Sequence, residues 1–193
     1  MKICLLGEGA VGKTSIRQRF LGYGFDSSYL ITLGADFAVK TIESTEYTYR
    51  FQIWDLAGQQ SFSGIRDLYY RGSLGALIVF DLTRPETLPA LENWVDGLYK
   101  HSNGAPLILL GNKADIAEET TISPDEITEF LDLLKGKRGF DVPYFETSAV
   151  SGKNIEEAFL LLGETIFREG KWEADKAHRW ARARAQMREK GDR

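Results

Sequence analysis

Gly7-Glu8-Gly9-Ala10-Val11-Gly12-Lys13-Thr14 follows directly on the apolar run Lys2–Leu6 and matches the pattern G-x-x-x-x-G-K-[ST]. The next residues, Ser15–Leu21, have the pattern of a helix. In such a strand-to-helix turn, glycines let backbone N–H groups point inward around phosphate oxygens, and the helix N-terminus adds its positive end. Lys13 would then reach the β- and γ-oxygens, and the Thr14 hydroxyl would ligate Mg²⁺. We therefore predict that phosphate is bound by Gly9, Ala10, Val11, Gly12, Lys13, Thr14 and Ser15.

The composition is that of a globular protein. The chain has 193 residues, of which 43% are hydrophobic and 27% charged, enough for one sizeable core. This excludes a disordered or fibrous protein. The net charge of −4 argues against binding nucleic acid through overall positive charge, so we expect no nucleic-acid partner.

The cysteine content and the lengths of the apolar runs indicate the cellular compartment in which the protein is expected. Cys4 is the single cysteine and falls in an apolar run, which predicts a buried, reduced thiol in an intracellular protein. No apolar run has the length of a signal-peptide core or of a membrane span. We expect a cytoplasmic protein.

Short apolar runs alternate with longer segments of helical period, which predicts a parallel sheet covered on both faces by helices. Ala35–Glu43 and the next strand should form an antiparallel hairpin with its turn at residues 43–46. Ser123 to Glu126 has the order of a capping box, and Asn154 with Glu157 repeats it. The expected strands are Lys2–Leu6, Ala35–Glu43, Tyr47–Asp55, Ala76–Asp81, Leu107–Gly111 and Pro143–Glu146. The apolar faces expected on two helices are Leu88, Leu91, Val95 and Leu98, and Ile155, Phe159, Leu162 and Ile166.

Asp55-Leu56-Ala57-Gly58-Gln59 follows the third expected strand. A carboxylate at the carboxyl end of a strand can hold Mg²⁺ through water, and Gly58 can bring its N–H to a γ-phosphate without side-chain hindrance. Gln59 would then orient the attacking water. This motif predicts a nucleoside triphosphatase.

Asn112-Lys113-Ala114-Asp115 follows the fifth expected strand and indicates which base is bound. Guanine carries N1–H beside an exocyclic amine, and the Asp115 carboxylate can accept both, whereas adenine lacks this pair of donors. The Asn112 amide suits the Hoogsteen edge, and the Lys113 stem can lie on the ring. After the last strand, Thr147-Ser148-Ala149 forms a small-residue turn whose N–H groups can meet the guanine carbonyl.

With these three motifs in order, the sequence resembles a small GTPase of the Ras superfamily, most closely its Rab branch, from residue 1 to about Arg168. The Rab-like segments are Leu33–Phe37, Trp54–Gln59 and Tyr69–Gly72. The resemblance implies an α/β fold of the P-loop NTPase class, a G domain over residues 1–170. It should have a six-stranded, mostly parallel sheet and about five helices, followed by a basic helical extension at 171–193.

The resemblance also assigns further residues. Thr32 corresponds to the switch I threonine that joins the Mg²⁺ shell with Thr14 and Asp55. Phe25 would pack on guanine, Tyr29 would lie near the phosphates, and residues 26–36 and 57–72 would be switches ordered by the γ-phosphate. The remaining base-loop contacts would come from Ser148, Ala149 and Val150, and the effector surface from the aromatic residues Phe37, Trp54 and Tyr69. For these three, packing between sheet and switch II is the alternative.

A switch of this kind requires partners: an exchange factor, a GTPase-activating protein and effectors. Gln60-Ser61-Phe62 stands where Rab proteins usually have Glu-Arg. This difference affects which exchange factors or activating proteins would recognise the chain. Val150 replaces a lysine, and we expect a modest effect because that contact is mainly backbone. No cysteine follows Cys4, so we expect no prenyl anchor.

The segment 171–193 holds eight basic and four acidic side chains and is expected to be helical. Three roles are open: a solvated helix folding back on the domain, a partner-docking helix, or an interfacial helix giving peripheral membrane contact. The default oligomeric state for the family is a monomer.

The motifs together predict slow GTP hydrolysis by in-line attack of water, with Gln59, Lys13 and Thr32 as the catalytic residues. A scaffold that binds GTP without hydrolysing it is the alternative. A phosphotransferase acting on a small acceptor would need a lid with clustered arginines, and the sequence has none.

Overall fold

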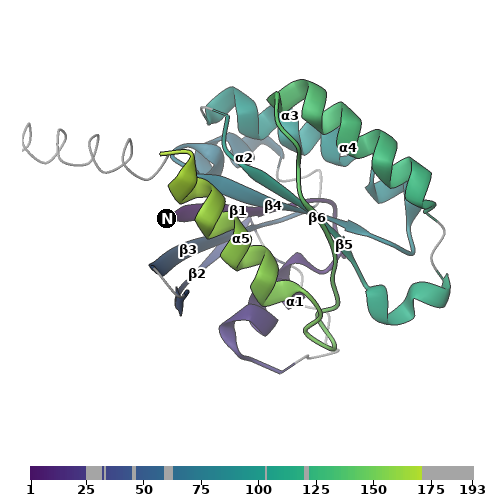
Figure 1. Cartoon of the computed structure of the whole chain (residues 1–193), viewed down its shortest axis with the longest axis horizontal. Helices are drawn as coiled ribbons and strands as arrows, with labels where there is room; N and C mark the ends of the chain where they lie inside the picture. Colours follow the sequence, from purple (N-terminus) through teal and green to yellow (C-terminus); the bar gives the residue numbers. More distant parts are fainter. Residues whose placement is uncertain are drawn as a thin grey trace, which may run out of the picture.

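A computed structural model of the chain describes residues 1–24, 32, 34–44, 47–58, 63–102, 104–119 and 122–170. Its centre is a six-stranded sheet in the order β2-β3-β1-β4-β5-β6 (Figure 1). The strands are β1 Lys2–Leu6, β2 Ala35–Glu43, β3 Thr48–Leu56, β4 Gly75–Asp81, β5 Leu107–Asn112 and β6 Tyr144–Glu146. The α-helices are α1 Lys13–Leu21, α2 Ser63–Tyr70, α3 Leu91–His101, α4 Pro124–Arg138 and α5 Ile155–Arg168, with short 3-10 segments η2 Pro85–Thr87 and η3 Ala114–Glu119.

The sheet is parallel except at one edge. β1 pairs in parallel with β3 and β4, β4 with β5, and β5 with β6, while β2 and β3 form the expected antiparallel hairpin. This confirms the predicted six-stranded, mostly parallel α/β fold. The six strands match their expected positions to within one residue at each end.

Helices cover both faces of the sheet. α1 and α5 lie on one face, and α2, α3 and α4 on the other (Figure 1). Successive β1 side chains alternate between the two cores: Ile3 and Leu5 pack toward α1 and α5, Cys4 and Leu6 toward the other face. All four are fully buried, as a central parallel strand requires. The predicted buried, free thiol of Cys4 is confirmed.

The sequence predicts a capping box at two helix starts, and the structure has it at one of them. At α4 the Ser123 hydroxyl accepts from the Glu126 N–H, and the Glu126 carboxylate accepts from the Ser123 N–H, so the predicted capping box is confirmed. The same prediction for Asn154 is wrong. Asn154 adopts φ 55°, and its side-chain amide donates to the Glu146 carbonyl, which ties the start of α5 to β6 instead.

The parallel strands end at one edge of the sheet. The loops after β1, β3, β5 and β6 therefore leave the sheet on the same side, although they are far apart in sequence. These loops carry the motifs singled out above. Among the described helices, none combines the length and the apolar character needed to cross a bilayer.

Phe159 on α5 is the centre of the core beneath α1. It is fully buried and stacks on Phe20 at 3.6 Å between ring centroids, with Phe51 edge-on at 6.1 Å. Phe159→Ala removes a ring that no neighbour can replace and should lower the free energy of unfolding by about 3–5 kcal/mol. Urea denaturation measures this. Phe167→Ala, at the half-exposed end of the same helix, is the matched control and should cost much less.

Candidate functional site

The loop after β1 has the shape of a phosphate cradle. Ala10 and Gly12 both have positive φ, 62° and 98°, which turns the chain tightly before α1 begins at Lys13. A Cβ atom at Gly12 would lie 2.2 Å from Asn112 Nδ2, so a larger residue has no room there. The Asn112 amide itself donates to the Val11 carbonyl at 2.8 Å. The loop is thus shaped by its own backbone and braced by the loop after β5.

Lys13 lies across the loop that precedes it. Its ammonium donates to the carbonyls of Gly7 and Glu8, each at 2.8 Å, and lies 5.9 Å from the ring centroid of Trp94. The Trp94 indole in turn donates to the Glu8 carboxylate at 2.9 Å, which fixes the loop against α3. Lys13 is only 6% exposed. A buried ammonium at the mouth of the loop is suited to anionic oxygens.

Thr14, Thr32 and Asp55, the three residues expected to hold a metal, come together from α1, the segment before β2 and β3. The Thr14 hydroxyl donates to Asp55 Oδ2 at 2.6 Å. Since a hydroxyl has one proton, the 2.9 Å bond between the two threonine hydroxyls runs from Thr32 to Thr14. Hydroxyl and carboxylate oxygens are the hard ligands that Mg²⁺ prefers.

The Asp55 carboxylate is fully buried, and its second oxygen, Oδ1, has no hydrogen-bond partner in the part of the chain that the structure describes. Burial raises the pKa of Asp55. The bond from Thr14 and the charges of Lys13 and Arg17 offset only part of that rise. An orphaned, desolvated carboxylate oxygen beside two hydroxyls fits a bound divalent cation, which would supply the missing partner.

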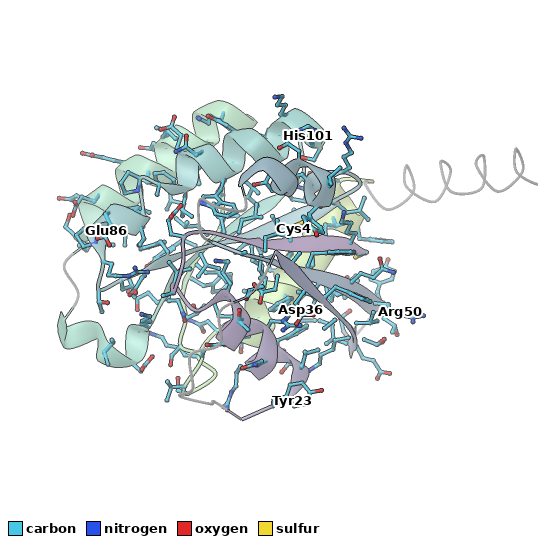
Figure 2. The ribbon with its side chains drawn as sticks, turned by 180° about the vertical axis from the view of Figure 1, so that it is seen from behind. Cys4, Tyr23, Asp36, Arg50, Glu86 and His101 are labelled. Carbon is cyan, nitrogen blue, oxygen red and sulfur yellow. The ribbon has the colours of Figure 1, made fainter. Side chains whose placement is uncertain are left out.

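Arg17 is a second cation at this position. Its guanidinium lies 2.6 Å from Asp36 Oδ2 and 3.7 Å from Asp55 Oδ2, with 9% of the side chain exposed. Figure 2 shows Asp36 beside α1, at the start of β2. Arg17 thus links the end of the predicted switch I to the metal-site carboxylate.

Gly58 lies against the phosphate loop. A Cβ atom at this position would stand 2.3 Å from the Glu8 carbonyl carbon and from the Gly9 nitrogen. Only glycine allows this approach. The loop after β3 is thereby brought to the loop after β1, as expected for a γ-phosphate contact.

The loops after β5 and β6, which carry the residues predicted to bind the base, are hydrogen-bonded to each other. The Ala114 N–H donates to the Thr147 carbonyl at 3.0 Å, and the Thr147 hydroxyl donates to Asn112 Oδ1 at 3.2 Å. Asn112 is therefore bonded to two loops, through Val11 and Thr147. Its amide has two hydrogens and two acceptor positions, so these bonds are compatible with a purine contact.

The remaining base-site residues differ in exposure. Asp115 is exposed at the start of η3, whereas Ser148 and Ala149 are buried and Val150 is 45% exposed. Lys113 has φ 69°, and its ammonium lies 2.7 Å from the buried Asp81 carboxylate. The structure thus brings together the described residues of all three motifs at one edge of the sheet.

Comparison with known proteins agrees with this arrangement. The sequence profile of the Ras family matches residues 2–168. The chain belongs to the Ras family. It is 36% identical over 166 residues to the GTP-binding protein YPT1 of Saccharomyces cerevisiae, covering 86% of this chain and 78% of YPT1. It is 37% identical over 169 residues to human Ras-related protein Rab-22A, covering 86% of this chain and 83% of that protein. These matches confirm a Rab-like small GTPase.

In this Ras-family chain the three aromatic residues expected on the effector surface are in contact. The Phe37 and Trp54 rings stack at 5.4 Å between centroids, and Tyr69 lies 5.5 Å from Trp54. Phe37 is 57% exposed, while Trp54 and Tyr69 are partly buried against the core. Their role in binding effectors stays a prediction.

Three predicted site residues, Phe25, Tyr29 and Gln59, lie outside the described residues, as does the segment 171–193. Conversely, the structure adds two arginines that the motifs did not indicate. Arg17 is four residues after Lys13 on the same helix face, a spacing that could have placed it at the sheet edge. Arg84 follows Asp81 at the end of β4 and donates to the Gly9 carbonyl at 2.8 Å. The only local feature of the sequence that points to Arg84 is its position just after a strand.

The raised pKa of Asp55 makes the stability of the folded protein depend on pH. Because the folded pKa lies above the ordinary value of 3.8, the buried charge destabilises the fold progressively as pH rises from about 4 toward the folded pKa. Asp55→Asn removes that charge and can still accept from Thr14. It should therefore raise the free energy of unfolding of the nucleotide-free protein in EDTA, by an amount that grows with pH and then levels off.

Urea unfolding across about pH 4 to pH 8 measures the difference between Asp55→Asn and wild type. Asp36→Asn is the matched control, because Asp36 shares Arg17 but its side chain is 58% exposed. It should show no comparable gain. An Asp55→Asn protein less stable than wild type at every pH contradicts this account of Asp55.

Proposed function

We propose that the protein is a guanine-nucleotide switch that binds GTP or GDP with Mg²⁺ and slowly hydrolyses GTP to GDP and phosphate. The observation that carries this proposal is the meeting of Thr14, Thr32 and Asp55 beside the phosphate loop, where one buried carboxylate oxygen of Asp55 has no partner among the described residues. Thr32 comes from the predicted switch I. Its hydroxyl would therefore couple the state of that segment to the bound nucleotide.

Thr14, Thr32 and Asp55 would hold the metal, Asp55 through water. When bound, Mg²⁺ offsets negative charge on the β- and γ-phosphates. Lys13, already buried at the mouth of the loop, adds a second fixed positive charge. The backbone N–H groups of residues 9–15 would complete the phosphate site.

Hydrolysis would use water held by Gln59 and by the Thr32 backbone, in line with the bond to the leaving β-phosphate. Gly58 supports this role because its backbone packs directly on Gly9, where the γ-phosphate contact is expected. An arginine supplied by an activating protein would add roughly 10³ to 10⁵ in rate.

Guanine would be selected by Asp115 accepting from N1–H and the exocyclic amine, with Asn112 on the Hoogsteen edge and the Lys113 stem on the ring. The Ser148 N–H donates to the Lys153 carbonyl at 3.3 Å. The backbone contact to the guanine carbonyl therefore falls mainly to Ala149 and Val150. Phe25 and Tyr29 would complete the site from the segment before β2.

The switch would act through partner proteins and would regulate a process of the membrane-trafficking type. Phe37, Trp54 and Tyr69 are the proposed effector surface, supported by their contact across β2, β3 and α2. An exchange factor and an activating protein would set the nucleotide state. The protein would work as a cytoplasmic monomer, with three roles open for residues 171–193: a solvated helix, a partner-docking helix or a peripheral membrane contact.

Gln59→Leu should keep GTP affinity and lower single-turnover hydrolysis at least about ten-fold, because the attacking water loses its orienting amide. The measurement is GDP formed per bound GTP in Mg²⁺, followed over hours. Gln60→Leu, the neighbouring glutamine, is the matched control and should hydrolyse at the wild-type rate. Unchanged hydrolysis in Gln59→Leu removes Gln59 from the mechanism, and tight GTP binding without turnover in wild type favours the scaffold alternative.

Asp115→Asn should weaken GTP binding by about 100-fold or more and improve binding of xanthosine triphosphate, which carries a carbonyl where guanine has its amine. Competition against fluorescent GDP measures both affinities, with ATP expected not to compete in either protein. Asp132→Asn, an exposed carboxylate on α4, is the control. Xanthine binding no better than in wild type counts against Asp115 as the reader of the base.

A further inference from the structure

Arg84 joins the end of β4 to the phosphate loop, 75 residues away in sequence. Its Nε donates to Asp81 Oδ2 at 2.9 Å, and its Nη2 donates to the Gly9 carbonyl at 2.8 Å. A guanidinium is planar, and its donors point in fixed directions, so these two bonds together fix its orientation. None of the three motifs of the nucleotide site includes this residue.

The effect of the bond from Arg84 depends on its acceptor, the Gly9 carbonyl. A trans peptide places the carbonyl of one residue and the N–H of the next on opposite sides of the peptide plane. With the Gly9 carbonyl turned toward Arg84, the Ala10 N–H points the opposite way, away from Arg84. Ala10 has φ 62°, a conformation that non-glycine residues adopt at some cost. A charge-assisted bond to the preceding carbonyl stabilises that conformation.

Asp81 holds the guanidinium in place. Its buried carboxylate accepts from the Thr83 N–H at 3.0 Å and the Thr83 hydroxyl at 2.8 Å, besides Arg84 and Lys113. Burial alone would raise the pKa of Asp81, but the bonds from Lys113, Thr83 and Arg84 outweigh it and keep the pKa below its ordinary value. The anchor of Arg84 is therefore an ionised carboxylate at neutral pH.

The geometry points to Arg84 as a positioning residue for nucleotide binding: anchored on Asp81, it holds the Gly9–Ala10 peptide with its N–H aimed at the distal phosphates. This rests on the proposed function. Gly58 packs on the Glu8–Gly9 peptide, and the Gly9–Ala10 peptide is the next one along the loop, so it lies near the side where the β- and γ-phosphates are expected. Arg84 does not itself touch the nucleotide in this arrangement, because the peptide separates them.

The test is the dissociation of fluorescent GDP from the full chain, with competition by GMP. Arg84→Gln, which cannot make both charge-assisted bonds, should speed GDP dissociation about ten-fold, in Mg²⁺ and in EDTA alike. GMP, which lacks the distal phosphates, should lose less than about three-fold in affinity. Arg50→Gln is the matched control. Figure 2 shows Arg50 on the opposite side of the molecule from Glu86, which is two residues after Arg84.

Three results overturn the inference: an unchanged GDP dissociation rate, an equal loss for GMP and GDP, or an acceleration confined to Mg²⁺. If Arg84→Gln folds poorly, Arg84→Lys provides a second test of the inference by the same measurement. It keeps the positive charge beside Asp81 but replaces the planar fork with a point charge, and it should also release GDP faster. A wild-type rate in Arg84→Lys contradicts the inference. Failure of the wild-type protein to bind GDP contradicts the proposed function instead.

Discussion

The hydrogen bond from Thr14 to Asp55 holds the site together, because it joins the first turn of α1 to the end of β3 at 2.6 Å. The parallel pairing of β1 with β3 brings these two residues within reach. From this bond the other contacts extend outward, to Thr32 on one side and to Arg17 and Asp36 on the other. A carboxylate buried this completely requires cationic or hydrogen-bonding partners, so its surroundings are constrained.

The buried carboxylates of this site face cations before any nucleotide binds. Asp55 faces Lys13 and Arg17, and Asp81 faces Lys113 and Arg84, so each buried carboxylate has two cations near it. The two sets differ in one respect. Hydrogen bonds fully compensate the burial of Asp81, whereas Asp55 keeps an unpartnered oxygen within the described residues. We interpret Asp81 as structural and Asp55 as the carboxylate kept available for a ligand.

The loops of the site are braced mainly by side chains bonded to backbone. Asn112 donates to the Val11 carbonyl, Arg84 to the Gly9 carbonyl and Trp94 to the Glu8 side chain. These three bonds come from β5, the loop after β4 and α3, which all lie outside the phosphate loop. The phosphate loop thus takes its shape from elements outside itself, and this is the physical basis for assigning Arg84 a positioning role.

The sequence alone determined the fold class, the strands to within a residue and the three nucleotide motifs, because each depends on contiguous residues and local backbone requirements. Glycine at positions 7, 9 and 12 and the capping box at Ser123 are of this kind. Tertiary structure decided what Asn154, Arg17 and Arg84 do. Long polar side chains have many rotamers and several acceptors within reach, and only the packed distances between β1, β3, β4 and β6 select one of them.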